Sequence, residues 1–256
     1  MKESSEIKIW RYLSLPKFVD FILNESVSLS RVDTFSDKKE GISNELITLI
    51  NIYKAEKEKY SDNNSHFPFV GISNPIDGLV LHSLSNEEKD NLKKLIADQK
   101  KYFISSWFIS EHESMAMWDL YSKSDGVAIL TTVNTIEKAI KKSNPFFDNG
   151  NLKHQKISYN NITKITDEHF STKSDMFDLL FRKDISFKHE NEYRFALFEK
   201  DGENQIPNKQ IKLVEKTINE FKIIAHPLMP SWQFENIIKL CGQKILKENI
   251  IKSRLT

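Results

Sequence analysis

One segment combines a strongly apolar stretch with an unusual density of charge. Residues 188–195 read Lys-His-Glu-Asn-Glu-Tyr-Arg-Phe, and the apolar run continues to Phe198. We predict a strand here, preceded by a short polar segment. Because side chains alternate across a strand, Glu190, Glu192 and Arg194 are expected on one face. Such charges are costly to bury without partners, so this face is expected at a solvated edge or in a reaction cleft.

Composition excludes several classes of protein. The chain has 256 residues, of which 39% are hydrophobic and 17 are Phe, so it can bury a substantial core. The balance of 37 basic and 36 acidic residues gives a net charge of +1, without the global field that binds nucleic acid or anionic membranes non-specifically. No apolar run approaches the roughly 18 residues of a membrane span, and the N-terminus has no apolar signal core. We therefore expect a cytoplasmic protein with no membrane contact.

Motifs for metals, phosphate loops and common nucleophiles are absent from the sequence. None of the seven His has the helical i, i+4 spacing of a zinc-protease motif, and the single Cys241 excludes a multi-cysteine zinc site. We expect no metal cofactor. The seven Gly form neither a dinucleotide-binding nor a P-loop pattern, which argues against a Rossmann or P-loop enzyme.

Periodicity and capping residues predict an α+β fold, because strands and helices mix without a strict βαβ rhythm. We expect a single domain over 1–256, with a less regular excursion at about 40–86. The predicted strands are 7–13, 27–32, 102–109, 126–132, 153–159, the strand of Glu190, 211–214 and 221–225. The predicted helices start at Ser14, Asn44, Ser85, Ser110, Asn134, Ser174 and Ser231 and end near Asn24, Tyr60, Lys101, Gly126, Lys142, Lys183 and Gly242.

Arg11 is a charged residue on an otherwise aliphatic face of the first predicted strand. Ile9 and Leu13 share that face. A guanidinium among aliphatic side chains needs an anionic partner, which is either a ligand phosphate or a carboxylate such as Glu192. Both alternatives stay open.

Two serines interrupt the most aromatic predicted strand, whose residues 102–108 read Tyr-Phe-Ile-Ser-Ser-Trp-Phe. Ser105 and Ser106 leave room for a ligand or for another backbone. The alternative is packing, with the serines beneath Trp107 or Trp118.

A stripe of large side chains follows on the next predicted helix. Met117, Trp118 and Tyr121 stand at i, i+1 and i+4. A stripe of this kind is usually core, and a ligand-framing role is the alternative.

The paired carboxylates suit a reaction with a cationic, oxocarbenium-like transition state. One carboxylate can stabilise the positive charge or hold a ribose hydroxyl, while the other activates an attacking group. The alternative is a Glu192–Arg194 ion pair on a wet sheet face, which contributes little to stability.

Five segments, taken in this order, resemble the bacterial domain-of-unknown-function (DUF) 2971 family, over about 7–227. Three departures are Phe187 in place of a frequent Trp, Ser106-Trp107-Phe108 in place of a Cys-Phe-Ser pattern, and a degenerate turn at 36–41. The segments are 9–15 (Ile-Trp-Arg-Tyr-Leu-Ser-Leu), 102–108, 117–121 (Met-Trp-Asp-Leu-Tyr), 126–129 (Gly-Val-Ala-Ile) and 190–194 (Glu-Asn-Glu-Tyr-Arg).

The order of an Arg, a Ser and a Glu-x-Glu on successive strands is also similar to the Arg-Ser-Glu arrangement of ADP-ribosyltransferases. This resemblance implies a split, mixed sheet and NAD as the substrate. Arg11 would contact NAD phosphate or ribose, Ser105 or Ser106 would line the nicotinamide side, and Glu192 would hold the nicotinamide ribose. Glu190 would orient or deprotonate the acceptor. The remaining cofactor-contacting residues implied by it are Tyr12, Trp118, Tyr121 and Arg194.

The sequence therefore leaves three functions open. The first is an ADP-ribosyltransferase-like enzyme or toxin-type effector in bacterial anti-phage or stress response, with a protein or nucleic-acid acceptor and a partner protein in a defence or toxin–antitoxin system. The second is a non-catalytic interaction module in which these Arg and Glu side chains form one internal ion network. The third is a nucleic-acid-processing defence effector, which the near-neutral charge disfavours. The first requires a cleft bounded by Arg11, one of the two serines and Glu192, whereas the second expects no cavity.

Overall fold

A computed structural model of the chain describes residues 6–35, 98–143, 151–160, 176–200, 207–214 and 217–255. The predicted excursion at about 40–86, the helix from Asn44 and most of the helix from Ser85 lie outside these residues.

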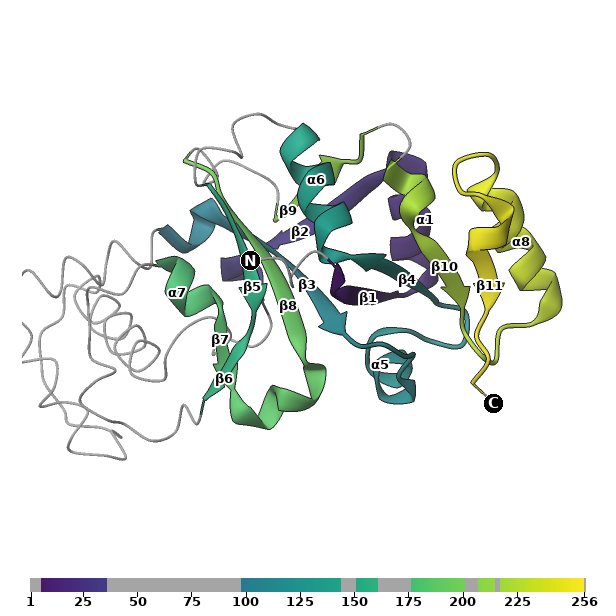
Figure 1. Ribbon diagram of the computed structural model, residues 1–256, viewed down its shortest axis with the longest axis horizontal. Helices are drawn as coiled ribbons and strands as arrows, with labels where there is room; N and C mark the ends of the chain where they lie inside the picture. Colours follow the sequence, from purple (N-terminus) through teal and green to yellow (C-terminus); the bar gives the residue numbers. More distant parts are fainter. Residues whose placement is uncertain are drawn as a thin grey trace, which may run out of the picture.

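Within the described ranges, a nine-stranded mixed sheet flanked by helices forms the framework (Figure 1), which confirms the predicted α+β class. The spatial order is β11-β10-β4-β1-β3-β2-β9, and β8 and β5 extend from the other edge of β3. Two further strands, β6 (Ser158–Asn160) and β7 (Arg182–Asp184), pair separately. The nine strands are β1 (Lys8–Leu13), β2 (Ser26–Arg31), β3 (Tyr102–Ile109), β4 (Val127–Thr132), β5 (Leu152–Lys156), β8 (Glu192–Phe198), β9 (Asn208–Lys212), β10 (Lys222–Ala225) and β11 (Ile250–Lys252).

The sheet divides along β3. One edge of β3 pairs with β8 from Tyr102 to Phe108. The other edge pairs with β2 at its beginning, through Phe103 and Ile104, and with β1 at its end, through Phe108 and Ile109. Between these two contacts, β1 and β2 diverge over Ser105–Trp107. The predicted split is therefore present, and it is centred on the serine pair.

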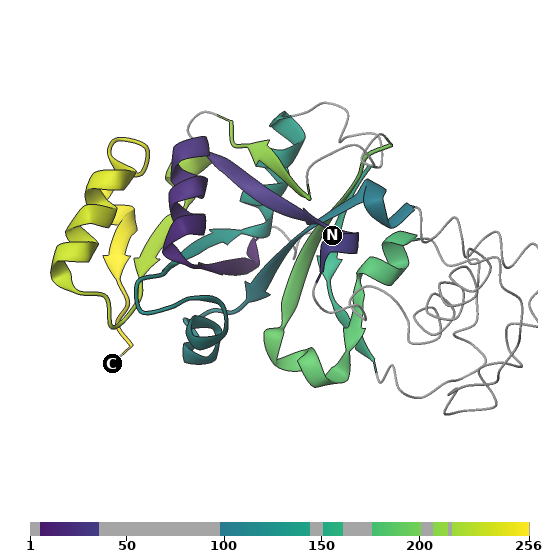
Figure 2. The same ribbon diagram turned by 180° about the vertical axis from the view of Figure 1, so that it is seen from behind.

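Helices cover both faces of the sheet. Figures 1 and 2 show α1 (Leu15–Asn24) and α6 (Val133–Ser143) on one side, with α5 (Met115–Tyr121) on the opposite side. Strand alternation explains the two layers, because Ile9 faces the large core with α1, α6 and α8 (Ser231–Cys241), whereas Trp10 packs with α5. Another short helix, α7 (Met176–Leu180), packs on the α5 side beneath β3 and β8. The candidate site residues lie around the split in the sheet, which is between these two helical layers.

Two predicted helix starts are wrong by a few residues. The N-cap of α5 is Ser114 and not Ser110; its hydroxyl accepts a hydrogen bond from the Met117 amide at 3.4 Å. For α6 the capping hydroxyl belongs to Thr132, which accepts from the Thr135 amide at 3.2 Å, and not to Asn134. In both cases a hydroxyl nearer the true helix start satisfies an amide that would otherwise lack a partner.

Two predicted elements are divided in the structure. The predicted strand 153–159 forms both β5 and β6, which belong to different sheets. The Ile157 amide still bonds to the Glu192 carbonyl of β8 at 2.9 Å, whereas the next amide, of Ser158, bonds to the Phe181 carbonyl just before β7 at 2.9 Å. The predicted helix that ends at Lys183 stops at Leu180, and Lys183 belongs to β7. Lys183 therefore reaches the site from a strand. Neither that strand, β7, nor β11 was predicted from the sequence.

Candidate functional site

A cavity of about 400 Å³ opens at the sheet split on the α5 side. Its volume falls within the range of small-molecule binding sites, roughly 300 to 1,000 Å³. Its lining combines aromatic and charged side chains. The lining includes Trp10, Arg11, Tyr12, Ser106, Phe108, Tyr121, Lys183, Phe187, Glu190 and Glu192.

The two carboxylates reach the cavity from different local structures. Glu190 ends a short 3₁₀ helix, Ile185–Glu190, and β8 begins at Glu192. Between them Asn191 adopts a left-handed conformation with φ of 37°, which Asn tolerates better than most residues. The Asn191 side-chain amide donates to the Ile109 carbonyl at 2.6 Å and fixes this turn against the end of β3. The predicted strand alternation through Glu190 is therefore wrong, and it is the turn that brings the two carboxylates together.

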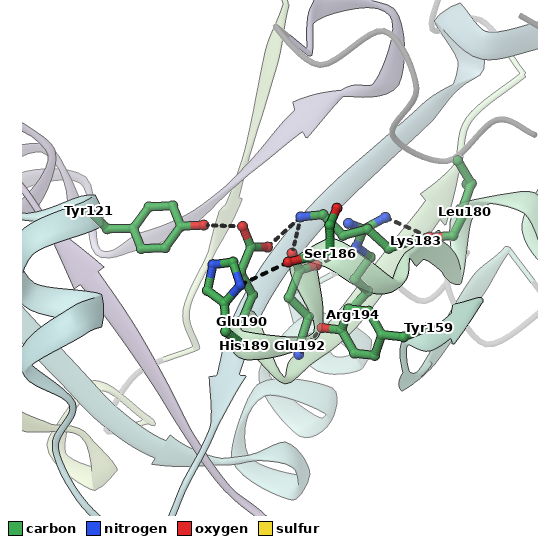
Figure 3. Close-up of polar contacts among 9 residues, drawn as sticks. All are labelled: Tyr121, Tyr159, Leu180, Lys183, Ser186, His189, Glu190, Glu192 and Arg194. Atoms are coloured by element: carbon green, nitrogen blue, oxygen red, sulfur yellow. Dashed lines mark hydrogen bonds and ion pairs between the residues drawn. The ribbon is translucent and has the colours of Figure 1, made fainter. Parts of the chain in front are cut away.

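Glu192 is held by two cations. Its Oε1 accepts a hydrogen bond from Lys183 Nζ at 2.7 Å, and its Oε2 accepts from Arg194 Nε at 2.7 Å. Arg194 is fully buried and also donates through Nη1 to the Leu180 carbonyl at 2.8 Å. The Glu192–Arg194 pair considered from the sequence exists, but it is buried and not on a wet face (Figure 3).

Glu190 is held from both sides of the cavity. Tyr121 of α5 donates its hydroxyl to Glu190 Oε1 at 2.8 Å, and Lys183 bonds to the other carboxylate oxygen. Figure 3 shows Tyr121 approaching from one side of Glu190 and Lys183 from the other. Lys183 therefore bridges Glu190 and Glu192, so these two carboxylates and the cations Lys183 and Arg194 form one charge-balanced group, the glutamate cluster.

Burial affects the two carboxylates differently. Burial raises the pKa of Glu190, and its contact with Glu192 raises it further, against the opposing effect of Lys183. Burial also acts to raise the pKa of Glu192, but the charge of Arg194, the contact with Glu190 and the charge of Lys183 together hold that pKa well below its ordinary value. The cluster thus combines a firmly ionised carboxylate with one that binds a proton more readily, a division seen in acid–base catalysis.

Arg11 stands apart from the glutamate cluster. Its Nη1 donates to Ser105 Oγ at 2.8 Å, and its guanidinium carbon lies 5.5 Å from the centre of the Trp107 ring. Burial lowers the pKa of Arg11 to about 10, so it stays charged at neutral pH. Within the part of the chain that the structure describes, Arg11 forms no ion pair. The predicted alternative partnership with Glu192 is wrong, because Lys183 and Arg194 occupy that carboxylate.

The two serines separate to opposite faces of β3. Ser105 is fully buried on the α1 side, where its hydroxyl also accepts from Trp107 Nε1 at 3.0 Å. Ser106 lines the cavity and stands opposite Arg194 on β8. Of the serine pair, Ser106 is the one placed beside the glutamates.

Of the aromatic candidates, two line the cavity and one lies in the core. Tyr12 and Tyr121 line the cavity. Burial raises the pKa of Tyr12 to about 12, and its hydroxyl accepts from the Ser114 amide at 2.9 Å. Trp118 is fully buried and packs edge-on against Tyr12 and His226, with ring centres 4.9 and 5.0 Å apart. Trp118 therefore belongs to the core and does not line this cavity.

Sequence reasoning missed Lys183, the residue that joins the two glutamates. Its side chain is 6% exposed and its ammonium lies 4.8 Å from the centre of the Phe187 ring. The available signal was a lysine two positions after Phe181, where the apolar run ends, and seven positions before Glu190. The predicted helix end at Lys183 hid this signal, because a helix end normally places Lys in solvent.

The described ranges contain neither a metal-binding cluster nor a membrane-spanning helix. No group of three or more His, Cys, Asp or Glu is placed there to hold a metal ion. None of the helices in those ranges has both the length and the apolar character of a membrane span.

Residues 117–195 match the DUF2971 family. The family is described as a protein of unknown function. The predicted resemblance is thus confirmed over this segment, which runs from α5 into β8 and contains Tyr121, Lys183, Glu190, Glu192 and Arg194. The DUF2971 segment therefore carries the whole glutamate cluster, whereas Arg11 and both serines precede it. No curated protein and no solved structure matches the chain.

Proposed function

We propose that the chain is an ADP-ribosyltransferase-like enzyme that uses NAD, acting as a toxin-type effector in bacterial anti-phage or stress response. The observation that carries this proposal is the cavity at the sheet split, which Arg11, Ser106, Glu190 and Glu192 line together. These are the groups that the Arg-Ser-Glu resemblance requires around one cleft.

The cavity has the chemical groups that NAD binding requires. Trp10, Tyr12 and Phe108 offer apolar ring surface for a nicotinamide. Arg11, with its guanidinium bonded to a hydroxyl and not to a carboxylate, can take a phosphate through paired hydrogen bonds. The glutamates provide acceptors for ribose hydroxyls.

The reaction would break the bond between ribose C1′ and the nicotinamide nitrogen. Both bonding electrons leave with nicotinamide, whose ring nitrogen loses its positive charge, and the ribose becomes oxocarbenium-like. The ionised Glu192 stabilises that positive charge. A hydroxyl or amine of the acceptor bonds to C1′, and its proton passes to Glu190, whose raised pKa suits a base.

Nicotinamide release tests this function directly. Purified protein is incubated with NAD and with protein, RNA or DNA acceptors, and released nicotinamide is quantified. We expect Glu192→Gln to reduce the rate by about 100-fold or more, as for loss of one electrostatic contact to a transition state. Glu235→Gln, on the exposed surface of α8, is the matched control and is expected to retain the wild-type rate. Equal silence of wild type and Glu192→Gln with all acceptors would remove the support for this function.

A non-catalytic interaction module is the second candidate, and a specific observation favours it. Lys183 and Arg194 already neutralise the glutamates, and both oxygens of Glu192 are bonded. In that case NAD is not cleaved, and Glu192→Gln changes the free energy of unfolding alone. Measuring nicotinamide release and the free energy of unfolding for both wild type and Glu192→Gln separates the two candidate functions.

A further inference from the structure

A second cavity, of about 410 Å³, lies on the α1 side of the same split. Arg11, Lys17, Ser30 and Trp107 line both cavities, so the two meet at the point where β1 and β2 diverge. The glutamate cluster contributes nothing to this second cavity. Its own polar lining comes from α1, β2 and β9, as Asp20, Ser26, Ser28, Asn208 and Gln210.

Positive charge dominates the junction of the two cavities. Among the residues that the structure describes, neither Arg11 nor Lys17 forms an ion pair with a carboxylate. The acidic residue of the lining, Asp20, accepts hydrogen bonds from the side-chain amides of Asn24 at 2.6 Å and Gln210 at 2.8 Å. Two cations with no carboxylate bonded to them are available to an anionic group such as phosphate.

Neutral hydrogen-bonding groups line this cavity along β2 and β9. Ser26, Ser28 and Ser30 alternate along β2 and so point to one face, and Gln210 and Asn208 on β9 stand opposite Ser28 and Ser30. The Ser26 hydroxyl donates to Gln210 at 2.8 Å. The hydroxyls of Ser28 and Ser30 bond to no other described side chain. Free hydroxyls and a carboxamide, adjacent to a cationic junction, match the hydroxyls of a sugar.

We infer that this second cavity binds a phosphorylated sugar, with the phosphate at Arg11 and Lys17 and the sugar hydroxyls at Ser28, Ser30 and Asn208. Phe21 and Trp107 provide the apolar surface against which the sugar ring packs. The site is formed whether or not the first cavity cleaves NAD, so it stands independently of the proposed function.

Calorimetric titration with ribose 5-phosphate, in the absence of NAD, tests the site. We expect saturable binding by the full chain, with ribose and inorganic phosphate each binding at least about tenfold more weakly, since each keeps part of the contacts. Phosphate that binds as tightly as ribose 5-phosphate would overturn the sugar assignment.

Two matched serine variants locate the ligand. Ser28 lines the second cavity alone and Ser106 the first alone. Ser28→Leu fills the proposed site and is expected to weaken binding by about tenfold or more, while Ser106→Leu changes it by less than about twofold. The reverse pattern, or equal binding by wild type and Ser28→Leu, would contradict the inference.

A charge variant covers the case in which Ser28→Leu fails to fold. Asn208→Asp keeps the size of the side chain and adds a carboxylate to the lining of the cavity that would hold the phosphate. We expect it to weaken ribose 5-phosphate by about tenfold and neutral ribose by much less, because like charges repel. Unchanged affinity for ribose 5-phosphate would also contradict the inference.

Discussion

The glutamate cluster and Arg11 line the same cavity but are held in different ways. In the cluster, each charge bonds to an opposite charge and Arg194 is fully buried. Arg11 bonds to the neutral hydroxyl of Ser105. Removing one partner of a buried ion pair is strongly destabilising, because the other charge is left buried and uncompensated. Removing a charge that has no opposite charge bonded to it leaves no such uncompensated charge behind. We therefore expect the cluster to determine stability and Arg11 to determine ligand binding.

The largest effect is expected from Arg194→Met. This change leaves the buried carboxylate of Glu192 without one of its two cations and removes the bond to the Leu180 carbonyl. We expect the free energy of unfolding to fall by about 3 to 5 kcal/mol, the range for breaking a buried ion pair. Chemical denaturation measures the change. A loss below about 1 kcal/mol, the level of a surface pair, would show that the cluster does not hold the fold.

Lys183→Met is expected to have the next largest effect. Glu190 and Glu192 then face each other without the ammonium between them, although Tyr121 and Arg194 still bond to them. We expect a loss of about 2 to 3 kcal/mol, somewhat less than for a fully unpaired charge.

The control for Lys183→Met is Lys8→Met. Lys8 pairs with Glu111 at 2.5 Å, but the two side chains are 48% and 65% exposed. A surface pair of this kind contributes less than about 1 kcal/mol. If both lysine variants lose the same stability, burial does not distinguish the two pairs.

The two glutamates are expected to respond to pH in opposite directions. Because the pKa of Glu190 is raised above 4.5 in the folded protein, its contribution is present below that pH and is lost as the pH rises through the raised pKa. Because the pKa of Glu192 is lowered from 4.5, its contribution is present above that pH and is lost as the pH falls through the lowered pKa.

Denaturation of Glu190→Gln and Glu192→Gln over a range of pH measures these contributions. Relative to wild type, Glu190→Gln is expected to gain stability as the pH rises above 4.5, and Glu192→Gln to recover stability as it falls below 4.5. Each unit of pKa shift corresponds to about 1.4 kcal/mol. Parallel curves for the two variants would show that the carboxylates are not differentiated.

Arg11→Met is expected to have the smallest effect on stability. The lost hydrogen bond to Ser105, about 1 kcal/mol, is offset because a buried charge no longer has to be desolvated. We expect the free energy of unfolding to stay within about 1 kcal/mol of wild type, while ribose 5-phosphate binding is lost. A destabilisation as large as that of Arg194→Met would remove the contrast between the two arginines.

The strands that frame the cavity could be predicted because each is defined by its own side chains. The run from Tyr102 to Ile109 is aromatic and β-branched, and β3 has these bounds. The alternation of Ile9, Arg11 and Leu13 likewise predicted β1 and the face on which Arg11 lies. Here the local sequence and the fold agree.

The partners within the cavity could not be predicted, because they depend on turns that reverse the chain. The left-handed Asn191 ends the alternation on which the placement of Glu190 relied. Lys183 meets both glutamates because a strand replaces the predicted helix end. The core position of Trp118 agrees with its helical stripe, but its contact with His226, which directly follows β10, could not be predicted. In each case the deciding contact comes from another part of the chain.

The pairing of β1 with β4 has a consequence for how the chain folds. Lys8 through Leu13 stand opposite Thr132 through Val127, so the first strand pairs along its whole length with a segment made much later. Contacts between distant segments slow folding, because a long loop must close before they form. The apolar side chains of Ile9 and Trp10 stay uncovered during synthesis until β3 and β4 emerge. Newly made chains are therefore expected to be prone to aggregation and to benefit from chaperones during that interval.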